Sequence, residues 1–402
     1  MNLTALRSHN TALVLDLLRT AGEGGISRLE LAERTGLTPQ AVSKITARLR
    51  AEGLAADAGR RASTGGKPRT LLRLVPGAAH AVGLHLDRDE LTAVLVDLAG
   101  VTVAARTTPL DLGAGADAVV DVAVGAVRAV AGAVRGVGGG VAGAVRGVEG
   151  GVAGAVRGVG GGVADVGAVS VHGASDPPAA LLARTVLGVG VAMPGPLDHA
   201  TGVPHRVTGF PQWDGYPLRD ALAARLGGGL PVALDKDTNA AALGLALKGA
   251  AGDSFVYVHL GTGLGAGLVL GGALHRGART GAGEFGHQTI QLDGPVCGCG
   301  GRGCLEALCL AAVARGDLDE AARVLGVGAA NAAGLLDIDR VLLGGRVVAA
   351  APGRFVRGVA AVLAERAARA GDAPVPVALA TTSPHPVAEG AAHLVLGPLF
   401  GL

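Results

Sequence analysis

Apolar residues recur at helical spacing in two short stretches near the start of the chain. They lie in "SRLELAERTG", at Leu29, Leu31 and Ala32, and in "TPQAVSKITARLRAEG", at Val42, Ile45 and Leu49. A tight turn at Gly36 separates the stretches. Thr38 can cap the second helix with Pro39 at its first position, and Gly53 can end it. The pattern predicts a helix-turn-helix.

The second predicted helix exposes polar groups that can bond base edges or phosphates from the major groove of DNA. These candidate contacts are Gln40, Ser43, Lys44 and Arg48. The next stretch, "LAADAGRRASTGGKPRTLLRL", has two strand-like ends around a Gly-rich tip, and we interpret it as a basic wing. Its candidate DNA contacts are Arg60, Arg61, Lys67 and Arg69. The alternative is a three-helix surface domain that binds protein.

From residue 81 onward, short β-type runs alternate with helical segments. The runs are "AVGLHL", "LTAVLVD", "VTVAAR", "TVLGVGVAM", "PVALD" and "DRVLLGG". A helix through Ala240 to Leu247 follows "PVALD", "SFVYVHLGTGLGAGLVL" is typical of a hairpin around a glycine loop, and two later helices close the chain. This alternation predicts an α/β fold with mixed sheets.

An eleven-residue repeat occupies residues 131–163, in three copies close to "AGAVRGVGGGV". Its valines recur at spacings of 3 and 4, which favours a helix. However, 14 of its 33 positions are glycine, and glycine costs about 1 kcal/mol relative to alanine in a helix. We expect a weakly helical insertion without chemistry of its own, with a flexible linker as the alternative.

Composition bounds the class of protein. The 402 residues allow two or three domains. The N-terminal segment lacks the order of a signal peptide, and no uncharged apolar span of membrane length follows, so we expect a cytoplasmic protein with no membrane partner. In that compartment clustered cysteines more often bind metal or perform chemistry than form disulfides.

Charge is divided unevenly along the chain. The net charge is +2, but residues 1–75 hold 12 Lys and Arg against 6 Asp and Glu, whereas the remainder holds 23 against 27. A basic N-terminal part on a mildly acidic body suggests a nucleic-acid reader joined to a different kind of domain.

One histidine and three of the four cysteines gather in "GHQTIQLDGPVCGCGGRGCLE". His287, Cys297, Cys299 and Cys304 form the ligand set that tetrahedral zinc prefers, and glycines between them let the backbone fold around an ion. Four protein ligands leave no place for a catalytic water, so we expect a structural zinc. Redox chemistry is less favoured because no Cys-x-x-Cys is present, and Cys309 lies outside the pattern.

This stretch resembles the zinc signature of the ROK family, named for repressors, open reading frames and kinases. The resemblance extends to the winged helix, "GVGVAMPGPLD", "YVHLGTGLGAGLVL", "GALHRGARTGAGEFGH" and "VLLGG". It implies a winged helix-turn-helix domain at 1–76 and an actin-like, two-lobed ROK domain at 77–402. The lobes would divide near residue 200, the C-terminal helix would return to the first lobe, and a sugar would bind between the lobes.

The resemblance also names candidate sugar contacts: Asp237, Glu284, His287 and Glu306. In family kinases the residue matching Asp237 is the general base. Lys236 stands where the family usually has asparagine. We expect it to form an ion pair with Asp235 or Asp237, to close the pocket to neutral sugars, or to favour a phosphorylated or acidic one. The alternative is that these residues are structural relics.

Family kinases hold ATP phosphates in an Asp-x-Gly-Gly-Thr turn between the first two strands. Here His85 replaces the acidic residue, and Asp87, Arg88 and Asp89 replace the glycines. Side chains would block such a turn and carboxylates would repel phosphate. Glycines remain at 261–267 and 344–345. The sequence therefore predicts that the chain is not a kinase.

Three functions stay open at this point. The first is a sugar-responsive regulator, a repressor of carbohydrate-utilisation genes, which binds an inverted-repeat operator as a homodimer or dimer of dimers. The second is an ATP-dependent ROK sugar kinase that also binds DNA, with Asp237 as catalytic base. The third is a DNA-binding regulator that has lost sugar control.

Overall fold

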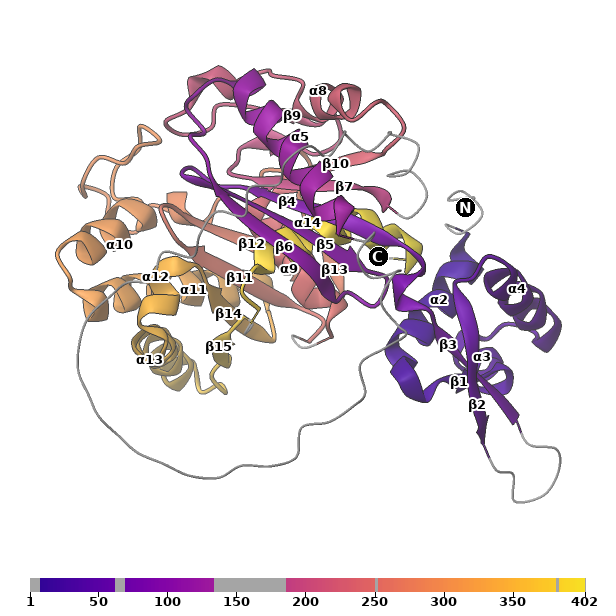
Figure 1. Cartoon of the computed structure of the whole chain (residues 1–402). Helices are drawn as coiled ribbons and strands as arrows, with labels where there is room; N and C mark the ends of the chain where they lie inside the picture. Colours follow the sequence, from indigo (N-terminus) through magenta and orange to yellow (C-terminus); the bar gives the residue numbers. More distant parts are fainter. Residues whose placement is uncertain (1–7, 62–68, 134–185, 250–251, 381–382, 402) are drawn as a thin grey trace, which may run out of the picture.

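The computed structural model describes residues 8–61, 69–133, 186–249, 252–380 and 383–401. A small N-terminal module packs against one end of a larger α/β body (Figure 1). The repeat at 134–163 and Lys67 of the wing lie outside the described residues. None of the helices within those ranges is long and apolar enough to cross a membrane.

The N-terminal module is a winged helix. Its elements are α2 (His9–Ala21), η1 (Gly22–Gly24), β1 (Ile26–Ser27), α3 (Arg28–Thr35), α4 (Pro39–Ala51), β2 (Ala55–Arg61) and β3 (Arg69–Leu74). The strand order is β1-β3-β2. The predicted helix-turn-helix is confirmed: the Thr38 hydroxyl accepts a hydrogen bond from the Ala41 amide, and Pro39 occupies the first turn of α4. Helix α2 was not predicted from the sequence.

A first five-stranded sheet forms one half of the body. Its strands are β4 (His80–Leu86), β5 (Glu90–Asp97), β6 (Thr102–Pro109), β7 (Val186–Met193) and β10 (Val232–Lys236), in the order β10-β7-β4-β5-β6. β4–β5 and β5–β6 are antiparallel, whereas β4–β7 and β7–β10 are parallel. Residues Val82, Leu84 and Leu86 alternate along β4 and belong to the same core as α5 (Ala116–Gly132) and α8 (Leu218–Arg225).

A second five-stranded sheet forms the other half. Its strands are β11 (Phe255–Leu260), β12 (Leu264–Leu270), β13 (Ala273–Leu274), β14 (Arg340–Gly344) and β15 (Val377–Leu379), in the order β13-β12-β11-β14-β15. A hydrophobic core joins this sheet to α10 (Leu305–Ala314), α11 (Leu318–Leu336) and α13 (Pro352–Ala370). The smaller elements are β8 (Leu197–Asp198), β9 (Val203–Pro204), α12 (Arg346–Ala350), and the 3-10 turns η2 (Pro76–Ala78), η3 (Pro211–Trp213), η4 (Phe285–His287) and η5 (Gly397–Leu399). The predicted α/β fold with mixed sheets is confirmed.

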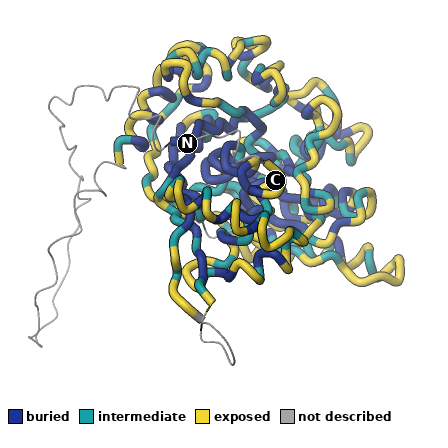
Figure 2. The backbone as a smooth tube through the Cα atoms, turned by 90° about the vertical axis from the view of Figure 1, so that its right-hand side faces the viewer, coloured by how far each residue is buried: buried dark blue, intermediate teal, exposed yellow. Residues whose placement is uncertain are grey.

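Helices α9 (Asp237–Leu247) and α14 (Pro386–Leu396) lie in the middle of the body (Figure 1). Buried residues gather in the interior of the molecule (Figure 2). The two helices approach each other closely because glycines face the contact: a Cβ added at Gly390 would clash with the Ala240 carbonyl group. On its other side α14 packs on β4 and β7, where a Cβ at Gly83 or Gly190 would clash with the α14 backbone. The two helices are therefore fixed to each other and to the first sheet.

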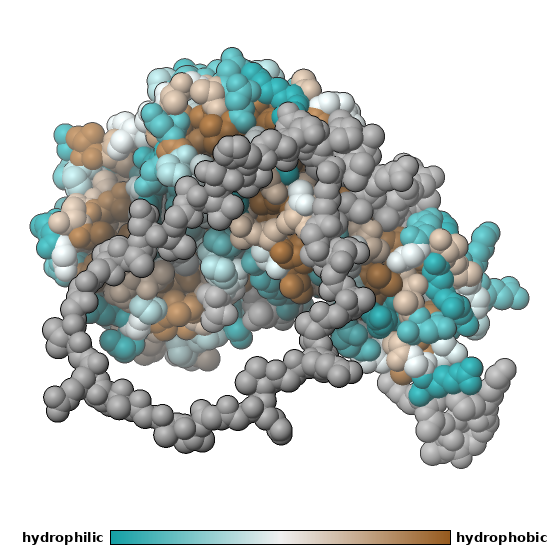
Figure 3. Space-filling model, in the orientation of Figure 1, coloured by the Kyte–Doolittle hydropathy of each residue, from teal (hydrophilic) through white to brown (hydrophobic). Residues whose placement is uncertain are grey.

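The winged helix and the body share a hydrophobic core. Leu15, Leu18 and Leu54 of the winged helix belong to the same buried cluster as Leu187 and Phe400 of the body. The sequence suggested two separate parts joined in one chain, but this contact surface is continuous. Hydrophilic side chains gather instead at the outer edge of the winged helix, away from the body (Figure 3).

Candidate functional site

A cavity of about 100 Å³ opens at the N-terminal end of α9, between the two sheets. All five candidate sugar contacts line it: Lys236, Asp237, Glu284, His287 and Glu306. They come from three places in the fold. Lys236 ends β10 and Asp237 begins α9. Glu284 directly precedes η4, and His287 is the last residue of η4. Glu306 lies in the first turn of α10. The structure thus gathers residues that are up to 70 positions apart in the sequence.

Lys236 lies at the end of β10 in the first sheet, and its side chain reaches the segment that precedes η4. Its Nζ lies 3.1 Å from Oε1 of Glu284 and donates a hydrogen bond to the Ala282 carbonyl. Of the alternatives for Lys236, the ion pair with Asp235 or Asp237 is not formed, because Lys236 pairs with Glu284 and Asp235 pairs with Arg276 at 2.6 Å. The Lys236 side chain is 4% exposed and that of Glu284 is 42% exposed. The ammonium is thus almost entirely buried against one carboxylate.

Burial controls the protonation of the groups around Asp237. Burial raises the pKa of the Asp237 carboxyl, and nearby His85 opposes that rise. Burial also lowers the pKa of His85, and it lowers that of His259 to about 4, with a further contribution from Arg346. His259 is therefore neutral at pH 7. It was not among the residues predicted from the sequence, although it stands in β11 just before the glycine loop at 261–267.

The turn between β4 and β5 is tied to the second sheet by Arg346. The guanidinium of Arg346 makes two contacts with Asp89, at 3.1 and 3.3 Å, and lies 3.8 Å from an Asp87 oxygen. Arg346 directly follows Gly344 and Gly345. The β4–β5 turn, which stands where family kinases hold ATP phosphates, is thus tied by an ion pair to the residue that follows Gly344 and Gly345. Arg346 was not predicted from the sequence, because nothing in the pattern indicates its partner.

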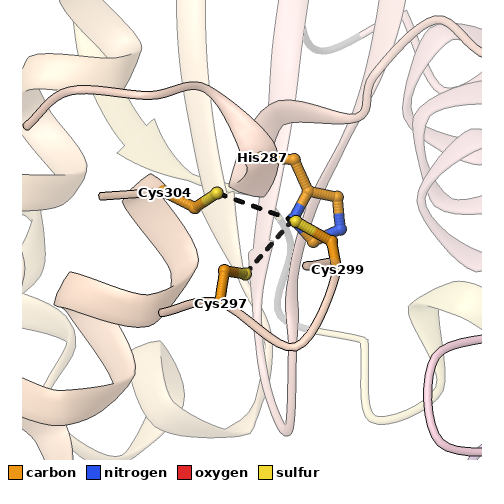
Figure 4. Close-up of side chains that lie close together, drawn as sticks. All are labelled: His287, Cys297, Cys299 and Cys304. Atoms are coloured by element: carbon orange, nitrogen blue, oxygen red, sulfur yellow. Dashed lines mark hydrogen bonds between the residues drawn. The ribbon is translucent and has the colours of Figure 1, made fainter. Parts of the chain in front are cut away.

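The four predicted metal ligands form one cluster (Figure 4). Their ligand atoms all lie within 4.8 Å of one another. Sγ of Cys297 is 3.7 Å from Nδ1 of His287, and the sulfurs of Cys299 and Cys304 are 3.8 Å apart. Zinc–sulfur bonds of about 2.3 Å in a tetrahedron separate two sulfurs by about 3.8 Å. The cluster therefore has the size and the donor atoms that a zinc ion requires.

The cluster joins two segments that line the cavity. His287 belongs to η4, and Cys304 is the residue before α10. Gly303 makes the turn between them possible: its φ is +62°, and a Cβ there would clash with the Gln291 carbonyl. Two residues after Cys304, Glu306 accepts a hydrogen bond from the Leu264 amide at 2.8 Å, which ties α10 to the start of β12.

The candidate DNA contacts fall into three groups. Gln40, Ser43 and Lys44 are exposed on α4, and Arg60 and Arg69 are exposed on the two wing strands. Arg48 instead turns toward α2, where its Nη2 donates to the Thr11 hydroxyl at 2.7 Å. Lys67 and the side chain of Arg61 lie outside the described residues.

Two family models match the chain, one in the winged helix and one in the body. The model of the winged helix-turn-helix DNA-binding family matches residues 13–55, and the ROK family model matches residues 178–312. The chain thus carries a winged helix-turn-helix match near its N-terminus, followed by a ROK family match within the body. The ROK match spans β7, the candidate sugar contacts and all four cluster residues. The family resemblance inferred from the sequence is confirmed.

Curated relatives of this chain include both repressors and kinases. A xylose repressor of Caldicellulosiruptor bescii is 26% identical over 307 residues, which cover 76% of this chain and 64% of the relative. A glucokinase of Thermotoga maritima is 43% identical over 135 residues, which cover 33% of this chain and 42% of the relative. The chain thus spans less than two thirds of the length of either relative.

A solved structure shares the fold of almost the whole chain. It is a ROK family transcriptional regulator, a homologue of the E. coli MLC protein, and it aligns with a TM-score of 0.66 over 97% of this chain and 98% of its own. At 20% identity this likeness concerns the fold. It confirms the predicted arrangement of a winged helix-turn-helix followed by an actin-like sugar-kinase fold.

Proposed function

We propose that this ROK protein is a sugar-responsive transcriptional repressor of carbohydrate-utilisation genes. The observation that carries the proposal is the combination, within one packed chain, of a winged helix with exposed polar groups on α4 and a cavity lined by five candidate sugar contacts. Xylose repressors among the relatives support it and make D-xylose the first effector to test. Under this proposal the winged helix, residues 1–76, binds operator DNA, and residues 77–402, with lobes divided near residue 200, bind the sugar.

The alternative of an ATP-dependent sugar kinase is favoured by the glucokinase relatives and by retention of Asp237. Against it stands the turn at Asp87–Asp89. Its carboxylates repel phosphate, and Arg346 pairs with them at the place where phosphates would enter. We infer that the chain does not transfer phosphate. ATP-dependent phosphorylation of D-glucose or D-xylose above the rate of a protein-free control would favour the kinase over the repressor.

A zinc ion bound by His287, Cys297, Cys299 and Cys304 is part of the proposal. The ion would contribute no chemistry to a reaction, because four protein ligands complete its tetrahedron. Its role would be to fix η4 and the start of α10, and with them Glu284 and Glu306. Nδ1 of His287 faces Cys297, which leaves Nε2 for a ligand in the cavity that His287 lines.

A homodimer, or a dimer of such dimers, would bind an inverted-repeat operator, because the symmetry of the protein dictates that of its site. The experiment selects DNA from a random duplex library on the full-length protein and then measures affinity for the selected site with and without D-xylose and D-glucose. Specific binding that one sugar changes supports the proposal. Specific binding that sugars do not change supports a regulator without sugar control, and absence of specific binding contradicts a repressor.

A further inference from the structure

Arg19 is a polar contact between the winged helix and the centre of the body, beside the hydrophobic core that they share. It lies in the last turn of α2, and its Nη1 donates a hydrogen bond to the Leu247 carbonyl at 3.1 Å. Its guanidinium also lies 5.2 Å from the centroid of the Phe400 ring. Asp16 holds the same guanidinium through two hydrogen bonds of 2.6 and 3.1 Å. With 16% of its side chain exposed, Arg19 is a fixed, largely buried contact.

The Leu247 carbonyl is the C-terminal end of α9, and the other end of that helix is in the sugar cavity. α9 begins at Asp237, which lines the cavity, and ends at Leu247. Its eleven residues span roughly 15 Å. A carbonyl in the last turn has no partner within the helix, so a cation there satisfies it and also favours the helix dipole. One short, buried helix therefore connects the cavity to Arg19.

The second contact of Arg19, Phe400, follows α14. α14 cannot slide freely on α9, because their backbones meet at Gly244 and Gly390. A 2.8 Å ion pair between Lys248, just after α9, and Glu389 of α14 adds a polar link. The two helices are thus packed and paired as one unit. Arg19 meets the C-terminal end of α9 directly and is linked to α14 through Phe400, which follows α14 and η5.

Within the winged helix, α2 continues the connection. Thr11, two turns before Arg19 on α2, accepts the hydrogen bond of Arg48 from α4. α4 carries the exposed Gln40, Ser43 and Lys44 that are candidate DNA contacts. α2 is therefore bonded to the body at one end and to the candidate recognition helix at the other.

We propose that Arg19 couples the cavity to the DNA-binding module, with α9 and α14 as the rigid element between them. A ligand that displaces Lys236 or Asp237 moves the N-terminal end of α9. The movement reaches α2 because Arg19 holds the far end of α9 and Phe400 together. That the ligand is a sugar rests on the proposed function. The coupling of α9 to α2 is testable without sugar or DNA.

The test perturbs the cavity from the opposite side of the cleft. Glu284→Leu removes the carboxylate that holds Lys236, the residue before α9, and leaves the sequences of α9 and α2 unchanged. Hydrogen–deuterium exchange is measured by mass spectrometry on the full-length protein. We expect several-fold faster exchange in peptides of both helices. In an Arg19→Ala background we expect the same change in α9 and its loss in α2.

Arg50→Ala is the matched control, because Arg50 pairs with Asp57 inside the winged helix at 3.2 Å and should leave the α2 response intact. Glu284→Gln, a milder change, replaces Glu284→Leu if the latter does not fold. An α2 response of equal size with and without Arg19 overturns the proposal. So does an α9 response with no α2 response in the presence of Arg19, or an α9 that does not respond at all. None of these results bears on whether the protein binds an operator.

Discussion

At the scale of single residues, the buried ammonium of Lys236 is held chiefly by Glu284. Removing one partner of a buried pair strands the other, whereas replacing the buried charge by an apolar group of similar shape removes its desolvation cost as well. We therefore expect Lys236→Met to change the free energy of unfolding by less than about 1.5 kcal/mol, and Glu284→Leu to lower it by about 3 kcal/mol. Urea unfolding measures both. A larger loss for Lys236→Met than for Glu284→Leu would show that Glu284 is not what chiefly stabilises the buried ammonium.

Residues differ in how far the sequence alone could place them. The metal site was predictable from the cysteines and His287 alone, because thiolate and imidazole ligands at short spacing commonly bind zinc. Lys236 was identified as a departure, but its partner was not. Asp235 and Asp237 are its neighbours in the sequence, whereas Glu284 lies 48 positions away and is brought to it only by the fold. Arg346 gave no signal at all. Its ion pair with Asp89 joins positions 257 residues apart.

At the scale of elements, the proposed zinc site at His287, Cys297, Cys299 and Cys304 predicts that loss of one ligand releases the metal. Wild-type protein should contain one zinc per chain, and Cys299→Ser should contain almost none, because three remaining ligands hold the ion far less tightly. The variant should also melt at a lower temperature, since η4 and α10 lose their common anchor. Cys309→Ala is the matched control, a buried thiol outside the cluster that should keep the zinc. Elemental analysis of both variants decides, and full zinc in Cys299→Ser would exclude this ligand set.

Helix α14 predicts a dependence of stability on pH. Burial, with Lys248 and Arg19 nearby and Glu389 opposing, lowers the pKa of His393 from 6.5 to about 4. Neither ring nitrogen has a hydrogen-bond partner among the residues that the structure describes. As the pH falls, His393 therefore takes up a proton in the unfolded chain before it does so in the folded one. Neutral His393 contributes its full stability above pH 6.5, and this contribution falls by about 3 kcal/mol toward pH 4. His393→Leu should lose less unfolding free energy than wild type between pH 7 and pH 4. Equal losses would show that His393 does not titrate in this way.

Element patterns were predictable where local signals sufficed. The helix-turn-helix follows from the caps at Thr38 and Gly36, and the strands follow from their apolar runs. The close packing of α9 on α14 did not follow, because Gly244 and Gly390 resemble ordinary small residues until the helices meet. The weakly helical insertion inferred from the valine spacing of the repeat remains a prediction, since residues 134–163 lie outside the described part of the chain.

At the scale of the whole molecule, the winged helix and body share a core, so the proposed DNA binding is tested on the full chain. Lys44→Ala should lower affinity for the operator by roughly 1–3 kcal/mol if Lys44 contacts a base. Arg60→Ala should act mainly on the salt dependence, reducing its slope by about one. Binding titrations at several salt concentrations separate the two effects. Wild-type affinity and slope in both variants would contradict the assignment of this surface to DNA.

The most direct test of a sugar-responsive repressor measures affinity of the full-length protein for its selected operator as D-xylose and then D-glucose are titrated. We predict that one of these sugars changes the affinity, and that Asp237→Ala abolishes the change while binding without sugar persists. Sugar control through this cavity would be contradicted by operator affinity that neither sugar alters, or by a sugar response that survives Asp237→Ala unchanged.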